Sequence, residues 1–206
     1  YPSVSSYRYF AGSLRKTGFR GDIIMAVSEE GKLKKSVAAY LRSQRVLAYP
    51  FKSSCGKKRG RGLLATPDGC VLDDWYVGGD QRGPRPLAVS RYEMYETWFR
   101  NYLPSSYMLV LDTRDTFFQA DPFAMLAERR TAAAAWRDLY VFEENGHKTV
   151  GGCKWNSGWL RRCFAGQPKD PSQPVRCSGS TMGSRDAMLA YVDGMVEAFD
   201  LLGTAP

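Results

Sequence analysis

Apolar residues recur at two different spacings along this chain of 206 residues, and the two spacings alternate. Apolar positions three and four residues apart predict helices. The helical spacing occurs from Val4 to Leu14, from Leu33 to Leu41, from Met94 to Tyr102 and from Met188 to Phe199. Short and nearly continuous apolar runs predict buried strands. These runs are Asp22–Val27, Val46–Tyr49, Tyr107–Leu111 and Leu139–Phe142.

Several helix ends can be predicted from single residues. Gly18 follows the first helical stretch and suits a C-cap. Ser90 and Glu93 have the spacing of a capping box, and Asp121-Pro122 supplies an N-cap followed by a first-turn proline. Ser184 is the expected N-cap of the last helix.

Strands that alternate with helices predict an α/β fold with a largely parallel central sheet flanked by helices. The chain begins on a predicted helix and stops soon after another, whereas a nucleotide-binding sheet of this kind usually begins with a strand. We therefore expect a single domain that is a fragment, clipped at both ends.

Composition narrows the function classes. With 44% hydrophobic residues the chain can form a sizeable core, and no apolar run is long enough to cross a bilayer, so we expect a soluble chain. The net charge of +8 suits a phosphate-bearing partner. The basic run Lys57–Gly62 has no aromatic residue within it, so a solvated loop face is favoured and no nucleic acid is expected.

The cysteines leave two alternatives open. The absence of a C-x-x-C pair, together with the single histidine His147, argues against a structural zinc site. Cys55 with Cys70, or Cys163 with Cys177, can bridge surface loops in an oxidising lumen. Buried free thiols are the equal alternative.

Two acidic residues directly after the strand Tyr107–Leu111 are the first candidates for chemistry. In open α/β sheets, ligands lie beyond the carboxyl ends of the strands, where Asp112 and Asp115 follow. Their carboxylates are ligands that a hard divalent cation prefers, and Arg114 between them can pair with phosphate or with an aspartate. The alternative is an ordinary turn with a surface ion pair, since carboxylates are common in turns.

A family resemblance favours the metal site over the turn. The segment Asp112–Phe123 resembles the extended DXD region of a group of GT-A glycosyltransferases from eukaryotes and algal viruses. Ser13–Val27 is similar to their early helix-to-strand unit, Asn156–Trp159 to their Asn-Ser-Gly segment, and Cys177–Ser184 to their small-residue loop before a helix.

The resemblance implies a GT-A, Rossmann-like nucleotide-diphospho-sugar transferase. It implies a nucleotide-diphosphate sugar as donor, Mn²⁺ or Mg²⁺ on its diphosphate, and the hydroxyl of a glycan, protein or small molecule as acceptor. Residues 1–111 are then the nucleotide-binding half, and residues 112–206 are the metal, donor-sugar and acceptor half. A secretory-pathway location, in the Golgi or ER lumen, is expected if the full-length protein carries a signal or anchor, and a cytoplasmic one otherwise.

The acidic pair departs from the family pattern. Two residues separate Asp112 from Asp115, where the common DXD pattern has one, so Thr113 can be the equivalent of its first position. Either aspartate can then be the direct ligand. Asp115 is preferred because it precedes the run Thr116-Phe117-Phe118, where the family's metal-binding acid lies.

Further candidates lie elsewhere in the chain. Asn156, Ser157 and Gly158 are candidates for donor-sugar contacts, and Arg91 for donor phosphate, although turn residues and a solvated arginine are the alternatives. Glu144 and its neighbour Glu143 are candidate bases toward the acceptor hydroxyl, in competition with Asp73 and Asp74. The small-residue loop, with Gly179, Ser180, Thr181 and Gly183, is a weak phosphate-loop candidate, and His147 is expected in an exposed loop.

Two other function classes remain. A haloacid-dehalogenase-like phosphatase also has an aspartate after a hydrophobic strand, but it needs one residue between its two acids, whereas two separate Asp112 from Asp115. A degenerate transferase fold that binds a nucleotide sugar or another anionic ligand without catalysis is the second alternative.

Overall fold

The computed structural model describes residues 3–29, 32–56, 69–73, 75, 77, 82–114, 116–129, 138–164 and 170–204. The chain forms two compact units, which are described separately. Unit 1 comprises residues 1–54, 71–81 and 111–135, and unit 2 comprises residues 55–70, 82–110 and 136–206. The predicted division at residue 112 concerned function and stays a prediction.

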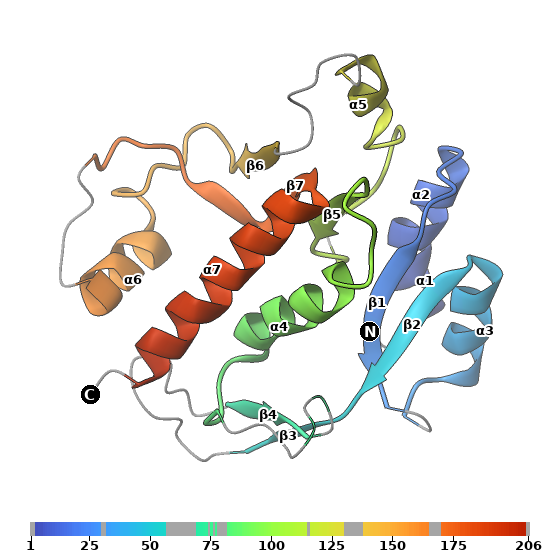
Figure 1. Ribbon diagram of the computed structural model, residues 1–206, viewed down its shortest axis with the longest axis horizontal. Coiled ribbons are helices and arrows are strands. Elements are labelled where there is room, and N and C mark those ends of the chain that lie inside the picture. Colours follow the sequence, from blue (N-terminus) through green and yellow to red (C-terminus); the bar gives the residue numbers. More distant parts are fainter. Residues whose placement is uncertain are drawn as a thin grey trace. The chain divides into compact units, whose positions relative to one another are not determined.

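Unit 1 is built on a parallel strand pair (Figure 1). Its first helical stretch consists of α1 (Val4–Tyr7), a π-helical turn η1 (Arg8–Gly12) and α2 (Ser13–Lys16), and Gly18 follows with a φ of 89°. Strand β1 (Ile23–Ser28), helix α3 (Lys35–Ser43) and strand β2 (Val46–Phe51) come next. These elements confirm the helices and strands predicted for this part of the sequence.

The strand pair is buried on one face. Ile23, Met25 and Val27, at alternate positions of β1, are buried, whereas Ala26 and Ser28 between them are exposed. On β2, Leu47 and Tyr49 are exposed as well. The expectation of a strand buried on both faces is therefore wrong for the described residues.

Arg15 holds the end of the first helical stretch against the end of α3. Its guanidinium donates to the carbonyls of Gln44 at 2.9 Å, Gly21 at 2.7 Å and Phe19 at 3.1 Å. Partial burial, together with the charge of Arg45, lowers the pKa of Arg15 from its ordinary value. Five N–H donors in a fixed fork let an arginine satisfy several carbonyls at once, which a lysine does not.

A disulfide joins Cys55 to Cys70 in unit 2. Strand β3 (Ser53–Cys55) pairs with β4 (Cys70–Leu72), and the backbone of Cys70 exchanges hydrogen bonds of 2.8 and 3.0 Å with that of Arg85. This bridge is one of the two that the sequence allowed. The other is wrong because Cys177 carries a free thiol, as does Cys153.

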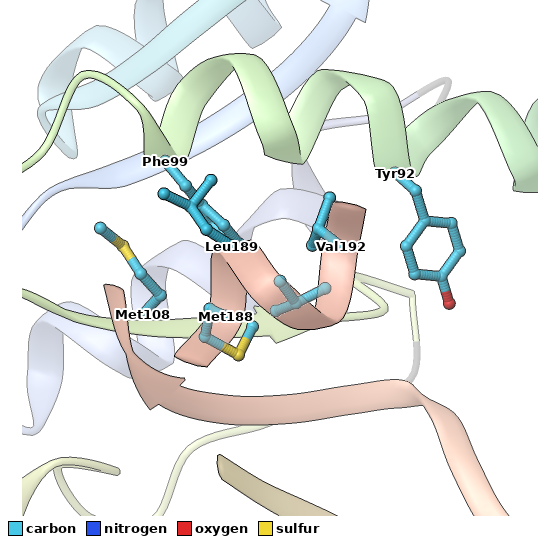
Figure 2. Close-up of a cluster of buried hydrophobic side chains, with 7 residues drawn as sticks. Tyr92, Phe99, Met108, Met188, Leu189 and Val192 are labelled. Carbon is cyan, nitrogen blue, oxygen red and sulfur yellow. The ribbon is translucent and has the colours of Figure 1, made fainter. Parts of the chain in front are cut away.

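The core of unit 2 lies between two helices and a strand. Helix α4 (Leu87–Phe99) and helix α7 (Arg185–Thr204) lie side by side, and the core also includes residues of strand β5 (Tyr107–Leu111) (Figure 1). Figure 2 shows their side chains facing one another. The cluster consists of Tyr92, Phe99, Met108, Val110, Met188, Leu189 and Val192. The predicted apolar stripe of the last helix is confirmed as core.

A buried ion network fixes α4 on its other side. Glu93 is 3% exposed, and its carboxylate accepts hydrogen bonds from Nε and Nη2 of Arg85 at 2.8 and 2.6 Å. Nη1 of Arg82 lies 2.7 Å from the same carboxylate, and Nε of Arg82 lies 3.2 Å from Asp200. A buried carboxylate needs this degree of pairing, because an isolated buried charge costs several kcal/mol or more.

The predicted capping box at Ser90 is therefore wrong. Helix α4 begins at Leu87, after Pro86, so Ser90 and Glu93 both lie inside the helix. The carboxylate of Glu93 accepts hydrogen bonds from Arg85 rather than from the backbone amide of Ser90. The buried hydroxyl of Ser90 has no hydrogen-bond partner among the described residues. The local sequence pattern is outweighed by the buried ion pair.

The second sheet of unit 2 has the strand order β5-β7-β6. Strand β6 (Leu139–Glu143) pairs antiparallel with strand β7 (Arg176–Ser184). The small-residue segment Cys177–Ser184, expected as a loop, is therefore a strand. Glycine at position 183 allows this pairing, because a Cβ there would lie 2.5 Å from the carbonyl oxygen of Asp138. Ser184 caps α7 as predicted, with its Oγ 3.4 Å from the amide of Ala187.

The remaining helices are α5 (Ala124–Arg129) and α6 (Lys154–Phe164). Asp121 accepts a 2.9 Å hydrogen bond from the amide of Phe123, just before α5. Among the described residues, no helix combines the length and apolar character needed to span a bilayer. The fold is thus mixed α/β with small sheets, of which β1–β2 is parallel and β6–β7 antiparallel.

Glu93→Gln is expected to lower the free energy of unfolding by about 3 kcal/mol, because the buried guanidinium of Arg85 loses the charge that it pairs with. Glu96→Gln is the matched control on the same helix. Glu96 pairs with the exposed Arg100 at 2.8 Å, so its loss is expected to cost less than about 1 kcal/mol. Urea unfolding followed by circular dichroism measures both, and equal losses would contradict the buried network.

Gly183→Ala is expected to destabilise the protein by about 1–3 kcal/mol, since the added methyl group meets the backbone of Asp138. Gly194→Ala is the comparison, and it is expected to stabilise the protein. A Cβ at Gly194, within α7, meets nothing within 4 Å, and alanine is favoured over glycine in a helix by about 1 kcal/mol. Thermal unfolding should show a lower midpoint for the first variant and a higher one for the second; the same sign for both would refute the close approach of β6 and β7.

Candidate functional site

The segment Asp112–Asp115 begins where β5 ends, at Leu111. The hydroxyl of Thr116 donates a 2.6 Å hydrogen bond to the carbonyl of Asp112, which closes a turn over the residues between them. Asp112 and Arg114 are exposed, and Thr113 is half-buried. Asp115, the preferred metal ligand, lies outside the described residues. The turn therefore presents one described carboxylate and one described guanidinium at the end of a buried strand.

Two phenylalanines anchor the chain that follows this turn. Phe118 is buried, its ring meets that of Phe10 edge-on with centroids 5.3 Å apart, and its amide donates to the hydroxyl of Ser13 at 2.9 Å. Phe123 stacks on Phe19 at 5.6 Å. All of these residues belong to unit 1. The segment that resembles the DXD region is thus fastened to the segment that resembles the early helix-to-strand unit.

Arg91 contacts the small-residue strand in unit 2. Its Nη2 donates to the carbonyl of Ser178 at 3.2 Å, and its guanidinium carbon lies 5.2 Å from the ring centroid of Tyr92. Two candidates from distant parts of the sequence, Arg91 and the segment Cys177–Ser184, are therefore neighbours. The expectation of a fully solvated arginine is wrong, because Arg91 is half-buried.

Tyr191 on α7 belongs to the same cluster. Burial raises the pKa of Tyr191 to about 12, and the Tyr92 hydroxyl adds to this rise. A hydrogen bond with Thr181 and the positive charge of Arg91 act in the opposite direction. Tyr191 is thus a neutral hydrogen-bonding group near neutral pH.

Asn156, Ser157 and Gly158 lie within helix α6 rather than in a turn. The side-chain amide of Asn156 donates to the sulfur of Cys153 at 3.1 Å, and the hydroxyl of Ser157 donates to the carbonyl of Cys153 at 2.9 Å. Both side chains therefore bond locally to Cys153, whose carbonyl also accepts a 3.0 Å hydrogen bond from the backbone amide of Ser157. Gly158 has open space at its Cβ position.

The candidate bases are engaged in exposed ion pairs. Glu144, directly after β6, lies 3.8 Å from the ammonium of Lys148, and Glu143 pairs with Arg176. The carboxylate of Asp73 accepts a 2.8 Å hydrogen bond from Ser54, and Asp74 lies outside the described residues. His147 is exposed in a turn, as predicted.

The candidates divide between the two units. Asp112 and Arg114 belong to unit 1, and Arg91, Glu144, Asn156, Ser157 and Gly158 belong to unit 2. In the described part of the chain, no group of three or more His, Cys, Asp or Glu side chains is arranged to hold a metal ion. Mn²⁺ and Mg²⁺ sites of transferases do not require such a group, since the metal uses one or two carboxylates together with substrate phosphates and water.

A groove of about 420 Å³ lies along α4 and α7 and is lined by Glu96, Asp193, Val196, Glu197, Asp200 and Leu201. Its carboxylates make it unsuited to a diphosphate, because like charges repel. Arg100 and Arg82 already pair with members of this set. The groove is therefore not a candidate donor site.

Sequence reasoning missed three of these features: the Glu93 network, Tyr191 and Cys153. Glu93 was assigned to a helix cap and Tyr191 was left out of the apolar stripe. Cys153 precedes α6, and hydrogen bonds from the backbone and side chain of Asn156 lower the pKa of its thiol. The sequence held no signal for this, because the helix that begins with Lys154 was not expected.

No protein-family model matches the sequence, and comparisons with curated proteins and with solved structures found no match.

Ser13→Ala is expected to lower the free energy of unfolding by about 1–3 kcal/mol, because the buried amide of Phe118 loses its acceptor. Ser43→Ala is the control, since the described bonds of the exposed Ser43 hydroxyl are local: it donates to the carbonyl of Tyr40 at 2.7 Å and accepts from the side chain of Gln44 at 3.4 Å. Chemical unfolding curves measure both variants. A Ser13 variant as stable as the Ser43 variant would mean that the hydroxyl does not hold the segment after Asp112.

Proposed function

We propose that this protein is a metal-dependent glycosyltransferase of the GT-A type, which transfers a sugar from a nucleotide-diphosphate sugar to an acceptor hydroxyl. The observation that carries the proposal is the anchored turn after β5. It exposes Asp112 and Arg114 at the carboxyl end of a strand, and Phe118 and Ser13 hold the chain that follows. The carboxyl end of a strand is where α/β proteins bind their ligands.

The residues around the turn fit a divalent cation that is shared with a diphosphate. Carboxylate oxygens are the ligands such a cation prefers. We assign the direct contact to Asp115, with Asp112 as the second acidic ligand, either direct or through water. A bound Mn²⁺ or Mg²⁺ supplies positive charge that stabilises the departing diphosphate.

Two arginines are assigned to the donor phosphates. Arg114 is exposed beside Asp112, and a guanidinium forms paired hydrogen bonds with phosphate oxygens. Arg91 is held at the carbonyl of Ser178, so its orientation is partly fixed before a ligand binds. Asn156, Ser157 and Gly158 remain the proposed contacts to the donor sugar.

Glu144 is the proposed base, which accepts the proton of the acceptor hydroxyl. Its only described ion pair, with Lys148, is long at 3.8 Å and lies at the surface. An exposed pair of this kind contributes less than about 1 kcal/mol, so it does not prevent Glu144 from contacting an acceptor.

The disulfide supports a location in the secretory pathway. Cys55 and Cys70 are bridged in unit 2, and disulfides persist in oxidising compartments such as the ER and Golgi lumen. Glycan and protein acceptors are abundant there, whereas a small-molecule acceptor would be compatible with either compartment.

Asp115→Ala is expected to weaken Mn²⁺-dependent binding of UDP or GDP by at least about 100-fold, since a charged ligand is removed from the metal. Asp112→Ala should weaken it as well. Isothermal titration calorimetry with and without EDTA measures the affinity, and Asp170→Ala, in an exposed loop, is the control.

Unchanged affinity in both aspartate variants would refute the site. Turnover of phosphate esters with Mg²⁺, without hydrolysis of nucleotide sugars, would show that the protein is a phosphatase and not a glycosyltransferase. Metal-dependent nucleotide binding without any transfer or hydrolysis would instead favour a non-catalytic binding domain.

A further inference from the structure

Helix α6 carries two exposed tryptophans together with several basic residues. Trp155 is 70% exposed and Trp159 is 49% exposed, and their ring centroids are 6.5 Å apart. The helix contains Lys154, Arg161 and Arg162 and no acidic residue. Large apolar side chains exposed beside one another indicate an interaction surface more often than an isolated exposed residue does.

The helical spacing arranges these residues on one face. Residues three and four apart are neighbours on a helix, so Gly158 lies between Lys154 and Arg161, and Trp155 lies next to Trp159. Lys154 and Arg161 are exposed, whereas Ser157, which borders them on the side away from the two tryptophans, is buried. We call the residues Lys154, Trp155, Gly158, Trp159 and Arg161 the outer face of α6.

Gly158 leaves a shallow space within the outer face. A Cβ at this position would meet nothing within 4 Å. The absence of a side chain here exposes the flanks of both its neighbours, a cation on one side and an indole on the other. A ligand that fits this face must therefore have an apolar surface next to a negative charge.

We propose that the outer face of α6 binds an anionic oligosaccharide, such as a chain of uronic acid or sulfated sugars. The C–H groups on one side of a pyranose ring form an apolar surface that packs on an indole. Lys154 and Arg161 bind the carboxylate or sulfate groups through charge-assisted hydrogen bonds. That this oligosaccharide is the acceptor rests on the proposed function, whereas the binding itself does not.

The geometry favours an oligosaccharide over other anionic partners. The two indole planes are inclined by 41°, so a nucleic acid base cannot lie flat against both. The outward residues include no Leu, Ile, Val or Phe among the described side chains, and a helix that inserts into a membrane presents a broader apolar stripe. The apolar part of the outer face is limited to the two indoles.

The test is a titration of the full chain with a hexamer of galacturonate at low salt. Tryptophan fluorescence and calorimetry measure the binding. Trp155→Ala/Trp159→Ala and Lys154→Gln/Arg161→Gln are each expected to weaken binding by about tenfold or more. Lys35→Gln/Arg42→Gln is the matched control. It removes the same charge from α3, with the same spacing of seven residues, and should change the affinity less than about twofold.

Maltohexaose, hexathymidylate and phosphatidylserine vesicles are titrated in parallel. Weak or no binding of all three, with the variant pattern above, supports the proposal. Equal losses in the α3 control, or hexathymidylate or vesicles that bind as tightly as the galacturonate hexamer, overturn it. No binding of the galacturonate hexamer overturns it as well.

Two further measurements separate this proposal from the proposed function. Thermal unfolding of each variant should match the unmodified chain, because the changed side chains are exposed. Mn²⁺-dependent UDP binding should be unchanged in the α6 variants. A chain that binds the hexamer but no nucleotide refutes the transferase alone, and the reverse result refutes the α6 site alone.

Discussion

The arrangement of unit 2 depends on the ion pair between the buried carboxylate of Glu93 and the guanidinium of Arg85, which the partly buried Arg82 joins. Arg85 donates to both oxygens of the carboxylate, and the backbone of Arg85 pairs with Cys70, which the disulfide ties to Cys55. Helix α4 is thereby fixed at one side. On its other side Tyr92 and Phe99 pack with α7 and with Met108 and Val110 of β5 (Figure 2). Arg91, on the same helix, donates a hydrogen bond to the backbone of β7 at Ser178.

The candidate metal site depends on how the chain after β5 is held within unit 1. Strand β5 ends at Leu111, and the hydroxyl of Thr116 donates a hydrogen bond to the carbonyl of Asp112. Further along, Ser13, Phe10 and Phe19 hold Phe118 and Phe123. Within unit 1, a turn that is followed by packed residues presents the carboxylate of Asp112 on an ordered backbone, and a metal shared with a diphosphate requires such order.

The sequence predicted the elements better than their arrangement. The spacing of apolar residues identified β1, α3, β5 and α7, because the burial of one face of a helix or strand directly determines which positions are apolar. The capping box predicted at Ser90 and the loop predicted at Cys177–Ser184 were wrong. Both segments carry local signals, a capping pair and small residues, but a buried arginine and a neighbouring strand outweigh them. Arg85 lies outside the four residues of the capping pattern, and β6 is far from β7 in the sequence, so neither local pattern includes the partner that outweighs it. The sequence did identify Asp112, Arg114 and Arg91 as candidates, whereas the inward bonds of Asn156 and Ser157 depend on a helix that was not expected.

The most direct test of the central claim is the position of a bound metal. Crystals of the protein grown with a nucleoside diphosphate and Mn²⁺ give an anomalous signal that locates the ion without reference to any assumed ligand. We expect an ion coordinated by Asp115, by Asp112 or by both, and by oxygens of the diphosphate. A diphosphate bound with its Mn²⁺ at any other group of residues, with neither aspartate in its coordination sphere, would contradict this expectation.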